Sequence, residues 1–400
     1  MTVGPDSTVV IVGAGAAGCA AAGGLRAAGF SGRVTIIGEE AGPPYDRPPL
    51  SKQVLAGTWD AERIHLLAEH QIAALGADWV YGRAVALDPA ERVVVAEDGS
   101  PHPYDAVVLA TGVEPRRLGS DDLAGVHVLR TLGDAIALRP QLAAGRRLVV
   151  VGGGFLGLEA AATARGLGCE VTVVEPLPVP LANRLGDLVA RRLIALHEEN
   201  GVTVLAGHGV HGLESSSGAV AGVRLGDGSL LAADAVLVAI GAEPRVDWLR
   251  GSGLTIDDGI LCDEYCLAAP EVWAAGDVAR WHHPGFGRYV RFEHRQNAAA
   301  QGSAVARSIA GTPTPFAPLP FFWTDHYEAK IQVWGLISEG AEARSVTGAP
   351  DSDSFVVAFH GHDEELPSAV LGWNAAAKLA PHRAVLAEAM KQRAEAALQV

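Results

Sequence analysis

The sequence predicts an α/β protein with two parallel-sheet domains and a small α+β domain at its C-terminal end. Three observations predict this organisation. First, the chain contains two segments with the order strand, glycine turn, helix and strand. Second, each segment is followed later by a buried strand, and these two strands have nearly the same sequence. Third, strand patterns of another kind appear beyond residue 320. The length of 400 residues is too great for one ordinary core, which agrees with two or three domains.

The first segment begins with an apolar strand over residues 8–12. Glycines at 13, 15 and 18 follow, then a small-residue helix to about Ala28, a stop at Gly29 and the strand "RVTIIGEE". This G-x-G-x-x-G spacing lets backbone N–H groups at a helix N-terminus approach a pyrophosphate. Glu39 lies 21 residues after Gly18, close to the offset at which an acid reaches the adenosine ribose. The segment therefore predicts a dinucleotide site.

The second segment repeats this order. It has a strand at 147–151, glycines at 152, 154 and 157, a helix to about Leu167, a stop at Gly168 and the strand "EVTVVE". Glu175 ends that strand, 18 residues after Gly157. Two such sites indicate that two dinucleotides are bound together, which is typical of electron transfer from a nicotinamide to a flavin.

A repeated strand closes each of the two units. "YDAVVLATGVEPR" (104–116) and "ADAVLVAIGAEPR" (233–245) are continuous apolar runs that end in a glycine turn, as expected of strands buried in a parallel sheet. A further buried strand within "PEVWAAGDVA" (270–279) ends at Gly276 and Asp277. Since ligands lie beyond the carboxyl ends of such strands, Asp277 is expected to face the first cofactor.

The C-terminal part has a different pattern. "GTPTPFAPLPFFW" (311–323) predicts a linker, "AKIQVWGLIS" and "DSFVVAFH" predict antiparallel strands, and "HRAVLAEAMKQRAEAAL" predicts a terminal helix. This smaller α+β domain carries no nucleotide motif.

Composition argues against several classes of protein. The net charge of −15 disfavours nucleic acid and anionic membrane as partners. The chain shows neither a cationic leader nor the roughly 20 uninterrupted apolar residues of a membrane helix, so a soluble cytoplasmic protein is expected. Cysteines 19, 169, 262 and 266 have no spacing typical of zinc, and no metal site is expected.

The segment "PPYDRPPLSKQVL" (43–55) resembles the signature of the oxygenase-coupled NADH-dependent ferredoxin reductases, the putidaredoxin reductase and aromatic-ring dioxygenase reductase type. "LRTLGDA", "VVVGGGFLGLEAA", "VWAAGDVA", "FEHRQNAAAQG" and "FWTDHYEAKIQVWG" agree with that family in order, from about residue 8 to 385. The resemblance implies two Rossmann-like domains arranged as in glutathione-reductase-like proteins. It divides the chain into an FAD-binding domain split over 1–112 and 242–320, an NAD-binding domain at 113–241 and the α+β domain at 321–400.

The resemblance also implies the cofactors, FAD and NADH, and their binding residues. The FAD set is Gly13, Gly15, Ala16, Ala17, Gly18, Glu39 on the ribose, Arg47, Lys52, Val85 through its backbone, Ala110, Thr111, Gly112, Arg130, Gly276, Asp277, Arg295 and Trp323. The NADH set is Gly152, Gly154, Leu156, Gly157, Glu159, Glu175 and Gly241. Glu175 is expected to accept a hydrogen bond from the ribose 2′-hydroxyl and to repel a 2′-phosphate, which favours NADH over NADPH.

Three residues of the family pattern carry the expected chemistry. Glu159 is implied to pair with Lys52 and so to position the nicotinamide over the flavin. Trp323 is implied to lie near the isoalloxazine as an exit for electrons.

In two places the sequence departs from the family pattern: Arg295 stands where relatives have Trp or Val, and His326 replaces a common Gln. Arg295 either brings a cation near the flavin or points into solvent.

The expected function is transfer of electrons from NADH through FAD, one at a time, to an acidic iron–sulfur ferredoxin that supplies a haem-thiolate or Rieske oxygenase. Five arginines between 280 and 307, against one glutamate, form a local cationic segment in an acidic chain. These arginines are Arg280, Arg288, Arg291, Arg295 and Arg307. They either dock the ferredoxin or form a solvated or phosphate-binding face. A monomer or weak homodimer is expected.

Other functions are weighed against this one. A rubredoxin reductase or an oxygen-reducing NADH oxidase has the same cofactors, and a redox signalling flavoprotein like apoptosis-inducing factor is disfavoured because the chain is acidic. Disulfide chemistry is not expected, since "EEAGPPYDRPPLSK" and residues 113–168 contain no cysteine and Cys262 and Cys266 lie elsewhere. The adjacent His282 and His283 predict a solvated pair.

Overall fold

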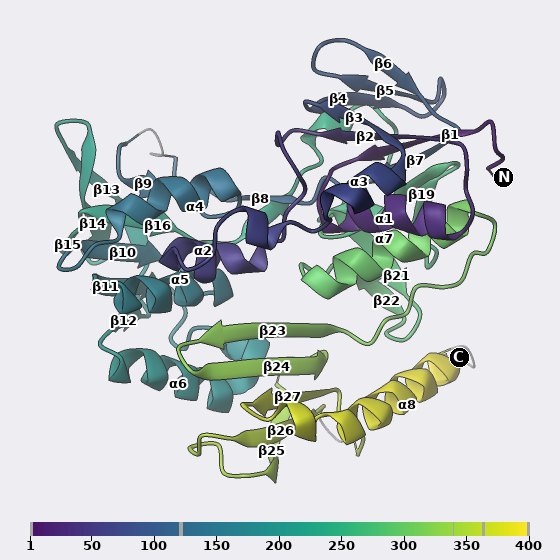
Figure 1. Ribbon diagram of the computed structural model, residues 1–400. Helices are drawn as coiled ribbons and strands as arrows, with labels where there is room; N and C mark the ends of the chain where they lie inside the picture. The colour runs from purple at the N-terminus through teal and green to yellow at the C-terminus, as the bar shows by residue number, and fades with distance from the viewer. Residues whose placement is uncertain (1–2, 120–122, 339, 362–364, 398–400) are drawn as a thin grey trace.

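The computed structural model describes residues 3–119, 123–338, 340–361 and 365–397. Two parallel sheets lie side by side, and the C-terminal sheet packs below them with helix α8 (Ala380–Ala397) beside it (Figure 1). The structure confirms the expected α/β fold with a small C-terminal α+β domain. No helix in these four ranges combines the length and apolar character needed to cross a membrane.

The first sheet joins strands from two distant parts of the chain. It has six strands, parallel except for the β19–β20 pair. In order across the sheet they are β19 (Leu267–Ala269), β20 (Val272–Ala274), β7 (Ala106–Leu109), β1 (Thr8–Val12), β2 (Arg33–Gly38) and β3 (Ala77–Tyr81). The near-continuous apolar sequences of the four inner strands, β20, β7, β1 and β2, are mostly buried, as is typical of strands covered on both faces.

Helices α1 (Ala16–Ala27) and α7 (Arg295–Ile309) pack closely against each other beside this sheet (Figure 1). Small residues permit the approach: a Cβ on Gly302 would lie 2.2 Å from the carbonyl oxygen of Ala17, and one on Gly24 would lie 2.7 Å from the Cβ of Ala306. The first glycine motif is thereby held against a helix that follows the Gly276–Asp277 turn.

The second sheet repeats the central order of the first. Val9 pairs with Val34 on one side and Ala106 on the other, and Val149 likewise lies between Thr172 and Val236. The five strands are β12 (Thr203–Ala206), β11 (Glu170–Glu175), β10 (Arg147–Val151), β16 (Ala235–Val238) and β9 (Val126–His127). The helices of this part are α4 (Leu132–Leu138), α5 (Phe155–Gly166) and α6 (Ala182–Glu199).

The two repeated "G-x-E-P-R" segments pair with each other. β8 (Val113–Pro115) and β17 (Ala242–Pro244) form an antiparallel ribbon in which Glu114 lies opposite Glu243. The backbone N–H of Arg116 donates to Gly241, and that of Arg245 donates to Gly112. The chain thus passes from one parallel sheet to the other and back through this ribbon. The division at residues 112 and 242 stays a prediction.

The remaining short elements decorate the two sheets. Three-stranded sheets are formed by β4 (Ala84–Asp88), β5 (Val93–Ala96) and β6 (Pro101–Pro103), by β13 (Val210–Ser216), β14 (Ala219–Leu225) and β15 (Leu230–Ala232), and by β18 (Ile260–Cys262), β21 (Ala279–His283) and β22 (Arg288–Val290). Helices α2 (Gln53–Ala56) and α3 (Glu69–Leu75) complete the N-terminal part.

The C-terminal sheet carries one strand into the centre of the molecule. Its five strands are β23 (Phe321–His326), β24 (Ala329–Gly335), β27 (Ala369–Trp373), β26 (Phe355–His360) and β25 (Glu342–Thr347). Phe355, Phe359 and Trp373 fill its core and are fully or almost fully buried. Gly186, in α6, leaves room for Phe359, since a Cβ there would lie 2.6 Å from that ring. This packing sets β23 against α5.

The prediction of a solvated His282–His283 pair was wrong for His283. Its side chain is buried, and its Nε2 lies 2.9 Å from the carbonyl oxygen of Pro318. Side chains alternate between the two faces of β21, so Ala279, Trp281 and His283 are buried on one face. The two adjacent histidines alone do not reveal this alternation.

Candidate functional site

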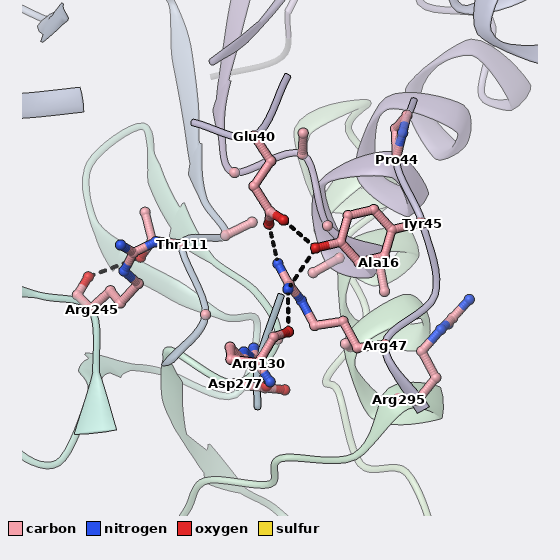
Figure 2. A pocket seen from close by; sticks show the side chains of 18 of the residues that line it. Ala16, Glu40, Pro44, Tyr45, Arg47, Thr111, Arg130, Arg245, Asp277 and Arg295 are labelled. Atoms are coloured by element: carbon pink, nitrogen blue, oxygen red, sulfur yellow. Dashed lines mark hydrogen bonds and ion pairs between the residues drawn. The ribbon is translucent and has the colours of Figure 1, made fainter. Parts of the chain in front are cut away.

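A cavity of about 650 Å³ lies at the carboxyl ends of β1, β2 and β7 and is also lined by residues of α5 and β23. Figure 2 shows part of its lining, including Arg47, Arg130 and Asp277. Seventeen of the predicted site residues line the cavity, from three separate parts of the chain. They are Gly13, Gly15, Ala16, Ala17, Glu39, Arg47, Lys52, Ala110, Thr111, Gly112, Arg130, Leu156, Glu159, Gly276, Asp277, Arg295 and Trp323.

The first glycine motif forms a turn that leaves no space for a side chain at Gly13 or Gly18. Gly13 has φ +113°, and a Cβ there would lie 2.2 Å from the carbonyl oxygen of Ala110. A Cβ on Gly18 would lie 1.9 Å from the carbonyl oxygen of Gly13. Gly15, the N-cap of α1, has open space where its Cβ would be and no capping side chain. The helix N-terminus therefore faces the cavity with room for a phosphate group.

The second glycine motif has the same geometry at the end of β10. Gly152 has φ +109°, and a Cβ there would lie 2.3 Å from the carbonyl oxygen of Ala239. A Cβ on Gly157 would lie 2.1 Å from the carbonyl oxygen of Gly152, and Gly154 is an uncapped N-cap with open space around it. The residues of both motifs fit a dinucleotide pyrophosphate.

The acid after each second strand is held in place differently. Glu175 accepts hydrogen bonds from the backbone N–H groups of Gly153 at 2.7 Å and Leu177 at 3.0 Å. Glu39 is paired with Arg245 and, at 2.9 Å, with Arg83. Burial alone would raise the pKa of Glu39, but these two guanidinium groups outweigh burial and hold the pKa below its usual value.

A second set of charges in the cavity is centred on Arg47, which has three partners, one of them the Tyr45 hydroxyl at 3.3 Å. Its guanidinium donates to the carbonyl oxygen of Arg130 at 2.7 Å and to Glu40 Oε1 at 2.6 Å (Figure 2). Arg130 in turn lies 3.2 Å from Asp277 Oδ2. The structure thus brings together in one cluster three residues that were predicted separately from the sequence: Arg47, Arg130 and Asp277.

The structure adds residues that the sequence did not single out. The hydroxyl of Tyr45 contacts Glu40 and accepts a hydrogen bond from the backbone N–H of Leu132 at 2.9 Å. Tyr45 lies inside the quoted "PPYDRPPL" signature, and Arg245 ends a repeated segment, so both had a sequence signal. Arg83 had none, because its partner Glu39 is distant in the chain. Glu40 had none either, since it lies outside the quoted signature, although its partners Tyr45 and Arg47 are nearby in the sequence.

Helix α5 brings a carboxylate from the second unit into the cavity of the first. Glu159 Oε2 lies 2.7 Å from Lys52 Nζ, and the two side chains are only 9% and 13% exposed. Ser51 donates to the same oxygen at 2.6 Å, and Thr324 donates to Oε1 at 2.8 Å. The predicted pair of Lys52 and Glu159 is therefore formed, with every oxygen of the carboxylate engaged.

Several predicted residues lie elsewhere or are differently engaged. Trp323 lines the cavity from β23, half-buried. Arg295 also lines it, with Nε 2.5 Å from Asp46 Oδ1, so its charge is paired and it does not point freely into solvent. Val85 is 47% exposed and lies outside the lining, while the neighbouring Ala84 is part of it. Gly18 is not part of the lining either. The residues of the second unit that lie outside the lining, at the second sheet, are Gly152, Gly154, Gly157, Glu175 and Gly241.

The cysteines are all buried thiols. Burial raises the pKa of Cys266 to about 12, and Gln301 donates a hydrogen bond to its sulfur at 3.3 Å. Such a thiol stays protonated and is a poor nucleophile.

Three buried histidines and the half-buried His294 predict sensitivity to acid. Burial lowers the pKa of His197 and His326 to about 3 and that of His283 and His294 to about 4. As the pH falls below 6.5, the unfolded chain binds protons that the folded chain does not, so the free energy of unfolding falls. At pH 5 we expect a loss of about 2 kcal/mol for each histidine. Thermal unfolding at pH 7.5 and pH 5 checks this; equal midpoints would contradict it.

The chain was compared with known proteins. The model of the pyridine nucleotide-disulphide oxidoreductase family matches residues 7–302, and that of the reductase C-terminal domain matches residues 321–399. Rhodocoxin reductase of Rhodococcus erythropolis is 39% identical over 88% of this chain and 83% of its own. The ferredoxin–NAD(+) reductase component of the anthranilate 1,2-dioxygenase system of Burkholderia cepacia is 37% identical over 90% and 89%. The solved covalent complex of putidaredoxin reductase with putidaredoxin matches with a TM-score of 0.90 and 35% identity, over 95% of this chain and 93% of that one.

Proposed function

Because the chain belongs to the pyridine nucleotide-disulphide oxidoreductase family, we propose that it is an FAD-containing, NADH-dependent ferredoxin reductase of an oxygenase system. It is a flavoprotein oxidoreductase that transfers electrons from NADH to a ferredoxin, as its relatives of that name do. The ferredoxin then supplies a haem-thiolate or Rieske oxygenase.

The observation that carries the proposal is the meeting of two dinucleotide sites at one ion pair. The first glycine turn, with Glu39, Arg47, Arg130 and Asp277, would hold FAD along the cavity. The second turn, with Glu175, would hold NADH. FAD supplies acceptance of a hydride and release of single electrons. Glu159, two residues beyond the second glycine motif, reaches into the FAD cavity and is fixed there by Lys52.

The role of the Lys52–Glu159 pair is to orient the two ring systems. Hydride transfer between nicotinamide and flavin requires alignment more than it requires a proton donor. Ser51, Lys52 and Thr324 fix the carboxylate from three sides, so its position is set before NADH arrives. Trp323, beside this pair on the cavity wall, is the proposed exit for electrons toward ferredoxin.

We propose that NADH is preferred to NADPH because of the Glu175 carboxylate. Glu175→Gln keeps an oxygen acceptor for Gly153 and removes the negative charge that repels a 2′-phosphate. The ratio of kcat/KM for NADH to that for NADPH should fall about tenfold, since like charges in contact cost more than 1.4 kcal/mol. Glu170→Gln, at the exposed start of the same strand, is the matched control. An unchanged ratio in Glu175→Gln would contradict the role.

An acidic ferredoxin is the proposed partner, and it needs a cationic face on this acidic chain. Of the five arginines between 280 and 307, Arg280, Arg291 and Arg295 are ion-paired. Arg288 and Arg307 are exposed and form no ion pair within the described residues. These two are therefore the docking candidates.

Reversal of charge at these positions tests the docking face. Arg288→Glu and Arg307→Glu should raise KM for ferredoxin several-fold and flatten its dependence on salt, because rim charges govern encounter. Ferricyanide reduction should be unchanged. Arg117→Glu, at another exposed arginine, is the control, and an equal effect of all three variants would argue against a specific face.

One assay separates this function from its alternatives. NADH-dependent reduction of cytochrome c is measured with the purified yellow protein, with and without added ferredoxin. Strong dependence on ferredoxin supports the proposal, whereas rapid peroxide formation without ferredoxin favours an NADH oxidase. Preference for rubredoxin as acceptor would favour a rubredoxin reductase, and flavin reduction with no acceptor turnover would favour a signalling role. We further propose a cytoplasmic protein that is a monomer or weak homodimer.

A further inference from the structure

A buried chain of hydrogen bonds leads away from the Lys52–Glu159 pair. Thr324 Oγ1 lies 2.8 Å from Glu159 Oε1 and 2.8 Å from His326 Nε2. His326 Nδ1 lies 3.2 Å from His197 Nε2. The Tyr327 hydroxyl lies 3.4 Å from His197 Nδ1. Four contacts thus join the carboxylate in the cavity to a tyrosine at the β23–β24 turn.

The chain crosses the contact between the second sheet unit and the C-terminal domain. Glu159 belongs to α5 and His197 to α6, whereas Thr324 and His326 belong to β23. The threonine and both histidines are buried, and Tyr327 at the far end is partly exposed. The route therefore runs from the cavity to the edge of solvent through protein interior.

The ionised carboxylate fixes the direction of every hydrogen in the chain. A carboxylate only accepts, so Thr324 must donate to it, and the hydroxyl then accepts from His326 Nε2. A neutral imidazole that carries hydrogen on Nε2 accepts at Nδ1, so His197 Nε2 donates to His326. By the same rule Tyr327 donates to His197 Nδ1. All four donors point toward Glu159, as in a path ready to deliver a proton there.

The surrounding charges favour neutral imidazoles. Burial is the main cause that lowers the pKa of both rings; Lys52 further lowers that of His326, and His326 further lowers that of His197. A hydrogen bond to the backbone of Leu158 acts in the opposite direction at His326, but burial outweighs it. Asp325, whose own pKa is raised by burial, faces Lys52 and Glu159, and Arg165 faces Tyr327. A proton is therefore not stored on the histidines but can pass through them.

We propose that Tyr327, His197, His326 and Thr324 form a proton path between solvent and the Glu159 carboxylate. Each group passes its hydrogen to the next, Glu159 Oε1 gains a proton, and water reprotonates Tyr327. The net change is one proton moved from solvent to Glu159, and the reverse sequence returns it. Protonation of Glu159 removes the counter-charge of Lys52, whose ammonium group then acts on the cavity.

The need for such a path rests on the proposed function. When NADH reduces the enzyme and NAD⁺ leaves, one negative charge stays in the cavity, and the proton on Glu159 offsets it. Reduction then consumes one NADH and one proton and releases NAD⁺. Reoxidation by two ferredoxins releases two protons, so a full cycle yields NAD⁺, two reduced ferredoxins and one proton from NADH.

Proton uptake during reduction tests the path directly. The anaerobic holoenzyme in weak buffer with a pH-indicator dye is mixed with one equivalent of NADH, and the dye and flavin absorbance are followed together. The wild type should take up about one proton per flavin in step with reduction. His326→Gln keeps hydrogen-bonding groups but cannot relay a proton, and should slow uptake roughly tenfold or more. His283→Gln, at a buried histidine outside the chain, is the control and should match the wild type.

Histidine tautomers give a second readout that does not depend on turnover. In the ¹⁵N-histidine-labelled holoenzyme, His197 and His326 should both carry hydrogen on Nε2, and Thr324→Val should remove this preference at His326. Normal flavin reduction without proton uptake, or equal uptake rates in His326→Gln and wild type, would overturn the path. Failure of NADH to reduce the flavin would instead count against the proposed function. In that case an Nδ1–H tautomer on either ring would still overturn the path, and two Nε2–H tautomers would support it.

Discussion

Gly18→Ala is expected to give a nearly colourless protein. A Cβ at this position would lie 1.9 Å from the carbonyl oxygen of Gly13, and both atoms belong to backbone, so α1 must move away from the turn. Overpacking of this kind costs about 1–3 kcal/mol, which lowers affinity for FAD roughly 10- to 100-fold. The absorbance at 450 nm per mole of purified protein measures the loss.

A matched control lies on the same helix. Gly23 also belongs to α1, and a Cβ there would meet nothing within 4 Å. Gly23→Ala should retain FAD and gain up to about 1 kcal/mol in stability, because alanine favours helix more than glycine does. Full flavin content in Gly18→Ala would show that the first glycine turn does not hold the pyrophosphate.

Lys52→Met is expected to slow reduction of the flavin by NADH. The substitution leaves Glu159 buried without its cation, although Ser51 and Thr324 still donate to it. A displaced carboxylate misaligns the nicotinamide, and a misplacement of about 1 Å costs about 100-fold in rate. Stopped-flow absorbance at 450 nm after anaerobic mixing with NADH measures this rate.

The same variant should be less stable. Breaking a buried ion pair by removing one partner costs about 3 kcal/mol, and Lys52→Met/Glu159→Gln should recover part of that loss since no uncompensated charge remains. Lys378→Met, at an exposed lysine of the C-terminal domain, is the control for both measurements. A reduction rate equal to that of the wild type refutes the positioning role of the pair.

Short-range sequence patterns were sufficient to predict the strands and glycine turns of the two parallel-sheet units. The strands Thr8–Val12 and Arg147–Val151 were predicted to the residue, because an apolar run that ends at a glycine turn is a short-range signal. The repeated "G-x-E-P-R" segments were recognised as copies. Their pairing with each other in β8 and β17 was not, because it joins residues far apart in the sequence.

The candidate site likewise consists of features that are visible in the local sequence and contacts that are not. The glycine motifs and the acids after them could be predicted from spacing, whereas the pair of Lys52 and Glu159 was implied only by family resemblance, since 107 residues separate them. The contacts of Glu39 with Arg245 and of His197 with His326 depend on how distant elements pack, and nothing local in the sequence indicates them. Burial of His283 was missed for a different reason, because alternation along β21 outweighs the polarity of two adjacent histidines.

The central claim is that FAD and NADH occupy the two sites of one chain at the same time, with their rings in contact beside Glu159. The most direct measurement is anaerobic titration of the purified yellow protein with NADH, followed at 450 nm. Bound FAD near one mole per mole of chain, with complete bleaching by about one equivalent of NADH, is the predicted result. A protein that binds no FAD on reconstitution, or that binds FAD which NADH does not reduce, would contradict the account.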